Sequence, residues 1–434
     1  MIKPEKYPGV SINKKGILHF GGADVVRLAE KFGTPLYVMD ERIVRDNCKA
    51  FRKEFGARYE GKVLVVYATK ALSSLAVLRI VADEGLGADA SSVGEIHGAL
   101  RAGFAADKIY FHGNFKKRED LEYALKNHIG RIVIDSREEA ELLNSVARRA
   151  GKKAAVLLRI TPGIEAHTHH MIQTGKIDTK FGVPLAGGEA FHMVKETLQK
   201  PHLNFMGFHC HIGSQILDMK PYRLTVEHAV EFMAKIKKQL GIAVREINLG
   251  GGFAVRYNSR QRLITKQQAA TAIAGTLTSL LKKQGLPFPQ LVIEPGRSIV
   301  APAGITLYAV GPVKEIPGVR NYVSVDGGMS DNPRPALYGA EYEALIANRA
   351  AAPAGRKYRI CGRHCENDIL FDNIPLPAPR YGDILAVFTT GAYNYSMSSN
   401  YNRFPRPAIV MLSKGKPRLI VERETLDDLY DKDI

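Results

Sequence analysis

The chain has 434 residues, of which 45% are hydrophobic and 24% are charged, a composition typical of a folded globular protein and one that excludes a disordered chain. No stretch approaches the roughly eighteen consecutive apolar residues of a membrane helix, and the opening MIKPEKYPGV lacks the apolar region of a secretory signal. Lysine and arginine outnumber the acidic residues by 61 to 44, which gives a net charge of +17.

This positive charge raises the question of nucleic-acid binding, but the basic residues are scattered along the chain. We therefore expect an evenly basic surface that attracts anionic substrates, and no nucleic-acid partner. The four cysteines are Cys48, Cys210, Cys361 and Cys365, and they fit a reducing cytoplasm better than a disulfide framework. The last two lack the second Cys or His pair of a zinc finger, so we expect no metal.

Strand-like runs alternate with segments of helical period between about residues 60 and 295. The runs are KVLVVY (62–67), LGADA (86–90), KIYFHG (108–113), RIVID (131–135), AAVLLRI (154–160), NFMGFHC (204–210), REINLGG (245–251) and QLVIEPG (290–296). Eight strands with helical crossovers predict a closed (β/α)₈ TIM barrel. A doubly wound open sheet is the alternative, and the number of repeats favours closure.

The pattern changes from about residue 300, where strands follow one another with turns and little helix between them. This predicts an antiparallel β-domain, and the hairpin-like VSINKKGILHFGG (10–22) is expected to join it. We therefore predict a barrel over 36–298, inserted into a β-domain made of 1–35 and 299–434. The long polar segment 163–182 is predicted to serve the active site at the rim of the barrel.

The active site of such a barrel is built at the C-terminal ends of its strands. Unusual residues stand at five of these ends: Lys70, Asp89, the run His209–Ser214, the triple glycine Gly250–Gly252, and the run Glu294–Arg297. Each has a structural explanation by itself, since a triple glycine can be a tight turn and a strand-end histidine is often structural. Together, at equivalent positions, they predict one site.

The chemistry of these residues suits a single ligand. The glycines Gly250–Gly252 offer backbone N–H groups to a phosphate, with the Ser214 hydroxyl as a further donor. His211 offers a flat ring for stacking, and Glu294 offers an anion that keeps a heteroaromatic nitrogen protonated. Lys70, at the end of an apolar strand, supplies an amine for an aldehyde, because desolvation disfavours the ammonium form. These features describe pyridoxal 5′-phosphate (PLP).

The same motifs carry a resemblance to a known family. Tyr67–Lys70, His209–Gln215, Gly250–Phe253 and Glu294–Arg297 resemble motifs of the fold-type III PLP-dependent decarboxylases, and within them of the diaminopimelate decarboxylase family. The likeness runs from about residue 15 to residue 412. It implies that Lys70 bonds to the cofactor's aldehyde and is catalytic together with His211. The cofactor-binding residues that it implies are Lys70, Asp89, His211, Ser214, Gly251, Gly252, Glu294, Gly296, Arg297 and Tyr393.

Substrate selection is expected from the β-domain. The segment 326–338, DGGMSDNPRPALY, is similar to the family segment that binds the distal end of diaminopimelate. A second amino-acid head needs a fixed cation for its carboxylate, and Arg334 can bind it bidentately, with Tyr338 as a hydroxyl donor. Arg297 is expected to make a further substrate contact, as is Tyr393. The alternative for Arg334 is a surface arginine between two prolines.

Cys365 and Glu366 resemble the family's Cys-Glu pair, which reaches across a dimer interface into the partner's site. The resemblance implies that the Cys365 thiol donates a catalytic proton and that Glu366 contacts the substrate's distal ammonium. Two departures are present. The run Cys365-Glu366-Asn367-Asp368 is one residue shorter than the common Cys-Glu-Ser-Gly-Asp, and Leu72-Ser73 stands where an asparagine is common.

The resemblance implies PLP-dependent decarboxylation of meso-2,6-diaminopimelate to L-lysine and CO₂, the last step of lysine biosynthesis, by a cytoplasmic homodimer with shared active sites. The nearest alternative is a related decarboxylase acting on carboxynorspermidine, ornithine or arginine. A non-catalytic regulatory homologue is a second alternative, against which the presence of both Lys70 and Cys365 argues.

Overall fold

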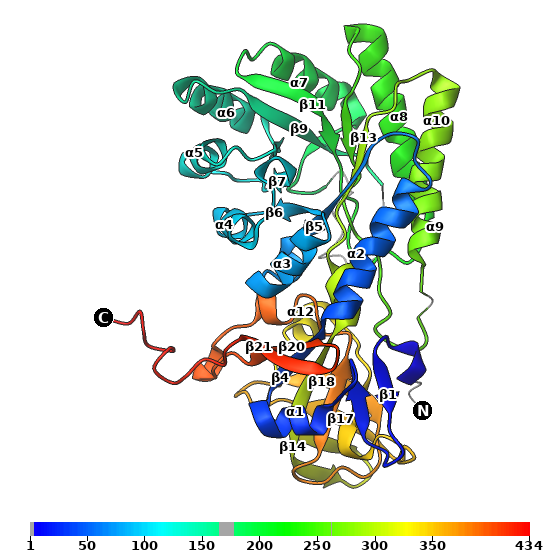
Figure 1. Cartoon of the computed structure of the whole chain (residues 1–434), viewed down its shortest axis with the longest axis vertical. Helices are drawn as coiled ribbons and strands as arrows, with labels where there is room; N and C mark the ends of the chain where they lie inside the picture. Colours follow the sequence, from blue (N-terminus) through cyan, green and yellow to red (C-terminus); the bar gives the residue numbers. More distant parts are fainter. Residues whose placement is uncertain (1–3, 165–177, 262) are drawn as a thin grey trace. The chain divides into compact units, whose positions relative to one another are not determined.

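The computed structural model describes residues 4–164, 178–261 and 263–434 (Figure 1). The chain forms two compact units. The barrel unit comprises Asn47–Ala254 and Leu263–Gly296, and the β-unit comprises Met1–Asp46, Val255–Arg262 and Arg297–Ile434. Most of the long polar segment 163–182 lies outside the described residues.

The barrel unit is built on eight parallel strands. In chain order they are β5 (Val63–Ala68), β6 (Gly87–Ala90), β7 (Ile109–Phe111), β8 (Arg131–Ile134), β9 (Ala154–Thr161), β11 (Leu203–His209), β12 (Glu246–Asn248) and β13 (Gln290–Ile293). Each strand pairs with the next, and β13 pairs with β5, which closes the sheet. A two-residue strand, β10 (Val183–Pro184), adds to β9. The predicted TIM barrel is confirmed, and the open-sheet alternative is wrong.

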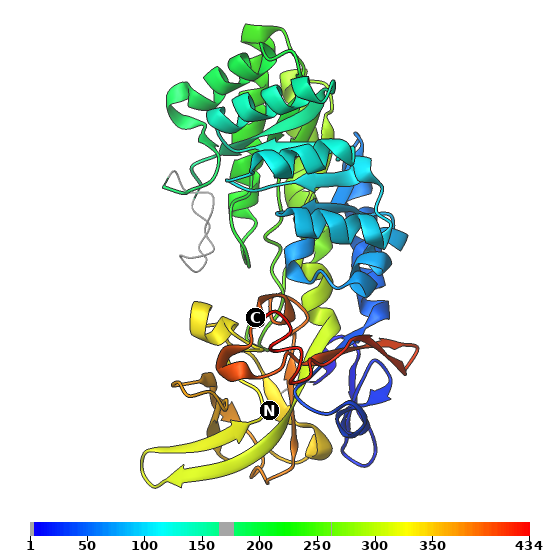
Figure 2. The same cartoon turned by 90° about the vertical axis from the view of Figure 1, so that its left-hand side faces the viewer.

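Helices connect these strands and lie outside them (Figure 2). They are α3 (Leu75–Asp83), α4 (Val93–Ala102), α5 (Arg118–Lys126), α6 (Arg137–Arg149), α7 (Glu189–Leu198), α8 (Lys220–Leu240), α9 (Lys266–Ala270) and α10 (Thr276–Gln284). Local sequence sets several of their ends. Ser92 and Ser136 cap α4 and α6 by accepting the backbone N–H groups of Glu95 and Glu139. No described helix is long and apolar enough to cross a membrane.

The barrel interior is packed with apolar side chains rather than open. A buried cluster is contributed by Val66, Tyr110, Val133, Leu157 and Val292, which come from five different strands. Because this packing fills the middle of the barrel, polar chemistry is confined to the strand ends.

The β-unit is a sheet centred on the long strand β14 (Gly304–Ile316), which pairs antiparallel with β4 (Leu36–Asp40), β15 (Arg320–Val325) and β19 (Ile384–Phe388). Its other strands are β16 (Ala344–Ile346), β17 (Lys357–Cys361), β18 (Ile369–Pro375), β20 (Ala408–Ser413) and β21 (Lys416–Val421). A small sheet of β1 (Val10–Ile12), β2 (Leu18–Phe20) and β3 (Ala23–Asp24) belongs to the same unit. Its helices are α1 (Val25–Phe32), α11 (Arg297–Val300) and α12 (Arg334–Tyr338).

Both ends of the chain contribute to this mainly antiparallel unit, as the sequence predicts. Two pairings are parallel, β15 with β17 and β20 with β4. The predicted barrel begins at residue 36, whereas residues 36–46 group with the β-unit in the structure. The reason is that β4 pairs with β14 and β20. Helix α2 (Glu41–Gly56) follows β4 and leads the chain into the barrel.

Candidate active site

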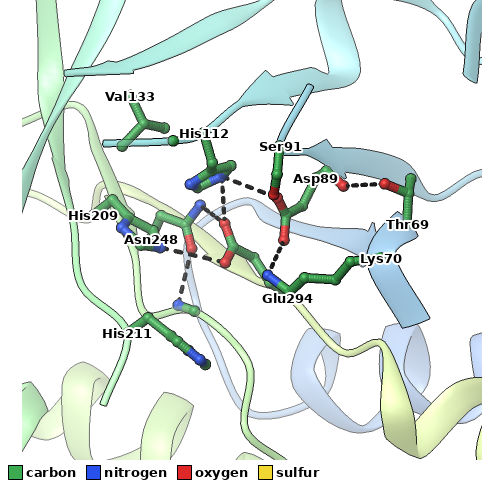
Figure 3. A network of polar contacts seen from close by, with 12 residues as sticks. Thr69, Lys70, Asp89, Ser91, His112, Val133, His209, His211, Asn248 and Glu294 are labelled. Carbon is green, nitrogen blue, oxygen red and sulfur yellow. Dashed lines mark hydrogen bonds and ion pairs between the residues drawn. The ribbon is translucent and has the colours of Figure 1, made fainter. Parts of the chain in front are cut away.

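Lys70 stands on a short 3₁₀ turn, Thr69–Ala71, that follows β5. Thr69 anchors the turn by donating its hydroxyl to the backbone oxygen of Asp89, at 2.8 Å. The Lys70 Nζ lies 3.3 Å from Oδ2 of Asp89 (Figure 3). The Lys70 side chain is 47% exposed and that of Asp89 is 1% exposed. The strand that leads to Lys70 is apolar and its last four residues are buried, while the lysine itself stands on the turn beyond it and pairs with a carboxylate.

Glu294 lies at the centre of a buried polar cluster at the end of β13. Its Oε1 accepts the Asn248 side-chain amide at 2.7 Å and lies 3.0 Å from Nε2 of His112. Its Oε2 lies 3.3 Å from Nε2 of His209 (Figure 3). Burial by itself would raise the pKa of Glu294, but the two histidines lower it to well below its usual range. The carboxylate is therefore a fixed anion, with lone-pair capacity for another N–H donor.

The two histidines of the sixth strand end are both neutral, chiefly because they are buried. Burial lowers the pKa of His209 to about 4, against the opposing effect of Glu294. Burial and then the charge of Lys70 lower the pKa of His211 to well below its usual range. The Gly251 N–H donates to Nδ1 of His211 at 3.2 Å, so this ring carries its proton on Nε2. His211 thus presents a neutral, oriented ring.

The triple glycine is a place of close backbone approach. Gly250 and Gly252 have φ angles of +67° and +92°, which favour glycine. A Cβ on Gly251 would lie 2.2 Å from the Glu294 backbone oxygen, and one on Gly252 would lie 2.3 Å from that of Gly213. Two of the three backbone N–H groups make hydrogen bonds within the protein. Gly250 donates to Asn248 Oδ1 at 2.9 Å and Gly251 donates to His211, because both side chains point back onto the turn.

Three residues of this site were not singled out from the sequence. His112 follows β7 and Asn248 ends β12, and both contact Glu294. Arg159 lies in β9, is buried, and has its guanidinium carbon 4.1 Å from the centre of the Phe181 ring. The sequence carries a signal for two of them, since a histidine directly after IYF and an arginine within AAVLLRI are out of place in apolar strands.

A second group of predicted residues lies together in the β-unit. Arg297 begins α11 and Arg334 begins α12, and both are buried. Arg297 lies over the ring of Tyr393, with its guanidinium carbon 4.6 Å from the ring centre. Arg334 lies 6.0 Å from the ring centre of Tyr338 and donates to the Tyr342 hydroxyl at 2.5 Å. No carboxylate of the described residues forms an ion pair with Arg334. A buried guanidinium of this kind is suited to binding an anion.

Cys365 lies in an exposed loop. Its N–H donates to Oδ1 of Asn402 at 3.0 Å, and the carboxylate of the next residue, Glu366, accepts the Tyr401 hydroxyl at 2.5 Å. The buried Asp368 accepts the Met329 N–H at 2.9 Å. The shortened loop is therefore tied through Asp368 to the segment 326–338.

Known proteins resemble this chain over its whole length. Residues 41–301 match the family described as pyridoxal-dependent decarboxylase, pyridoxal binding domain. A diaminopimelate decarboxylase of Bacillus subtilis is 45% identical over 423 residues, which is 97% of this chain and 96% of the relative. The crystal structure of diaminopimelate decarboxylase from M. jannaschii in complex with L-lysine has a TM-score of 0.93 at 36% identity, and the match covers 100% of this chain and 99% of that one. A lysine/ornithine decarboxylase of Vibrio vulnificus, 23% identical with a TM-score of 0.76, shares the fold.

The residues at the barrel's strand ends fit PLP, the cofactor of this family. The amine of Lys70 is accessible, at 47% side-chain exposure. The Oδ1 atom of Asp89 is buried and makes no hydrogen bond to the described residues. Glu294 is a buried anion that suits a protonated ring nitrogen. On these grounds, the chain belongs to the diaminopimelate decarboxylase family of pyridoxal-dependent decarboxylases.

Proposed function

We propose that this protein decarboxylates meso-2,6-diaminopimelate to L-lysine and CO₂, with PLP as cofactor, as the last step of lysine biosynthesis. The observation that carries the proposal is Arg334, a buried guanidinium without a carboxylate partner among the described residues. Diaminopimelate has a second amino-acid head whose carboxylate needs such a cation, whereas ornithine has none. The identity of 45% to a diaminopimelate decarboxylase supports the same substrate.

Most of the residues that hold the cofactor in this proposal belong to the barrel. Lys70 bonds to its aldehyde, Glu294 keeps its ring nitrogen protonated, and His211 faces its ring. When bound, PLP supplies the electron sink for the electron pair that departing CO₂ leaves behind. The remaining proposed cofactor contacts are Asp89, Ser214, Gly251, Gly252, Gly296, Arg297 and Tyr393.

The substrate is oriented by its distal end. Arg334 binds the distal carboxylate, with Tyr338 as a hydroxyl donor, and Arg297 and Tyr393 make further substrate contacts. Fixing this end selects which of the two carboxylates is lost, because orientation decides which group reaches the reacting position.

The protein acts as a cytoplasmic homodimer in this proposal, with each active site completed by the partner. Cys365 of the partner subunit donates a proton to the carbon that loses CO₂, and Glu366 of the partner subunit contacts the distal ammonium. The exposure of Cys365 supports this role, since a thiol that served only packing would be buried.

A substrate panel tests the proposal. Purified protein with added PLP is given diaminopimelate, ornithine, arginine and carboxynorspermidine, and CO₂ and the amine product are measured. We expect CO₂ and L-lysine from diaminopimelate. Faster turnover of one of the other substrates would identify a related decarboxylase, and no CO₂ from any of them would identify a non-catalytic homologue.

A further inference from the structure

Tyr257 lies between the two buried arginines of the β-unit. It belongs to the short segment Val255–Arg262, which the chain contributes to this unit before returning to the barrel. Arg297 donates to the Tyr257 hydroxyl at 2.5 Å. The guanidinium carbon of Arg334 lies 4.9 Å from the centre of the same ring. The Tyr257 side chain is buried, so one phenol faces two cations away from water.

The electrostatics of Tyr257 differ from those of its neighbour Tyr342. Burial by itself would raise the pKa of Tyr257, but the positive charges of Arg297 and Arg334 lower it. Tyr342 accepts from Arg334 and donates to Asn394 at 3.3 Å, and burial raises its pKa to about 12. Tyr257 therefore contacts both arginines, Arg297 through its oxygen and Arg334 through its ring. Tyr342 packs edge-on against it, with ring centres 5.1 Å apart.

We propose that Tyr257 is a positioning residue for the distal carboxylate of the substrate. A guanidinium carries five N–H donors in one rigid plane, so a hydrogen bond to one corner fixes the direction of the others. The Tyr257 oxygen fixes the guanidinium plane of Arg297 in this way, and the Tyr257 ring lies against the guanidinium of Arg334. Arg334 still has a buried Nε without a hydrogen bond to the described residues, and that donor is left for a ligand.

This inference rests on the proposed function and makes it more specific. Ligands that carry the distal carboxylate depend on the two arginines, and L-lysine keeps that carboxylate after the reaction. The diamine 1,5-diaminopentane has the same carbon chain between its two amino groups as diaminopimelate and L-lysine, and it has no carboxylate. Its binding is therefore independent of Tyr257, while the binding of diaminopimelate and of L-lysine is not.

The test is Tyr257→Phe, which removes the oxygen and keeps the ring. The PLP-loaded variant is assayed for kcat and KM with diaminopimelate, and its cofactor absorbance is titrated with L-lysine and with 1,5-diaminopentane. We expect the KM and the Kd of L-lysine to rise together by roughly 10-fold or more, the usual effect of losing a hydrogen bond to a charged group. We expect kcat and the Kd of the diamine to change by less than about threefold.

The matched control is Tyr59→Phe. Tyr59 is a buried tyrosine of the barrel unit whose hydroxyl donates to the Pro289 backbone oxygen at 2.7 Å, and its loss should leave all four constants unchanged. Equal weakening of the diamine and L-lysine in Tyr257→Phe, a fall in kcat alone, or unchanged constants would each overturn the inference. Failure of the wild-type protein to decarboxylate diaminopimelate would instead overturn the proposed function.

Discussion

The amine of Lys70 lies 3.3 Å from a carboxylate oxygen of Asp89, and the two side chains differ greatly in exposure, at 47% and 1%. Asp89 is held within the barrel, where its other oxygen lies 3.6 Å from Nε2 of His112. Because the carboxylate is fixed, it fixes the position of the amine, which would otherwise be a mobile side chain on a turn. The lysine is thus positioned before any ligand binds.

Replacing Lys70 with alanine is expected to abolish turnover, because the amine that bonds to the cofactor is lost. Borohydride treatment of the wild-type protein followed by peptide mapping should find PLP on residue 70. Lys126→Ala, on the surface of the barrel, is the control. Normal activity of Lys70→Ala, or a label on another lysine, would contradict the assignment.

Replacing Glu294 with glutamine is expected to lower kcat by about 10²-fold, the usual order for removing one preorganised electrostatic contact. The neutral amide no longer stabilises a protonated ring nitrogen, which weakens the electron sink. CO₂ release is measured at saturating substrate, and the PLP content of the variant is measured in parallel. A variant with full PLP content and unchanged kcat would show that Glu294 only holds His112 and His209 in place.

Much of this arrangement could be predicted from the sequence, because strand ends of a barrel converge. The eight strands lie close to their predicted positions, and the strand-end rule identified Lys70, Asp89 and Glu294, whose side chains lie in one cluster. The contacts of Glu294 could not be predicted in this way. Which of His112, His209 and Asn248 contacts it depends on side-chain directions across the barrel, which the alternation of residues along a strand does not specify.

Side-chain contacts in the β-unit could not be predicted from the sequence either. The segment 326–338 predicted Arg334, but its neighbour Tyr257 comes from a short segment far away in the sequence. A tyrosine in FAVRYNS has no local pattern that points to an arginine. Pairing of β4 with β14 is also long-range, which explains why the predicted start of the barrel and the observed grouping of residues 36–46 differ.

Replacing Arg334 with alanine is expected to raise the KM for diaminopimelate by roughly 10²-fold or more, because the distal carboxylate would lose a buried cationic partner. Arg334→Lys should recover only part of the affinity, since lysine cannot bind a carboxylate bidentately. Arg320→Ala is the control, since this arginine pairs with Asp372 at 3.0 Å near the surface. An unchanged KM in Arg334→Ala would rule out this residue as the carboxylate site.

Replacing Cys365 with alanine is expected to lower kcat while leaving PLP bound, because a proton donor is lost. Sharing of sites between subunits is tested by mixing Lys70→Ala and Cys365→Ala proteins after dissociation. Each mixed dimer would hold one site with both residues intact, so an equal mixture should regain about a quarter of wild-type activity. No recovery, together with proof that mixed dimers form, would place Lys70 and Cys365 of one site in the same subunit.

Stability should depend on pH through Asp331, a buried acid that accepts the N–H of Gly328 at 2.7 Å and the hydroxyl of Tyr308. Burial raises its pKa to about 7, although these hydrogen bonds oppose the change. In the unfolded chain an aspartate ionises near pH 4. Between these two values the folded protein holds a proton that the unfolded chain has released, so this group makes unfolding easier as the pH rises from about 4 to 7.

Asp331→Asn removes this titration and keeps the shape, since an amide oxygen still accepts from Gly328 and the Tyr308 oxygen can accept from the amide nitrogen. Urea unfolding midpoints of the wild type and the variant are compared at pH 5 and at pH 7.5. The free energy of unfolding of the variant, relative to that of the wild type, should be higher at pH 7.5 than at pH 5. The increase should be at most about 1.4 kcal/mol for each pH unit crossed. The exposed Asp107→Asn should show no such change. A difference between wild type and Asp331→Asn that is the same at both pH values would mean that Asp331 is already ionised in the folded protein at pH 5.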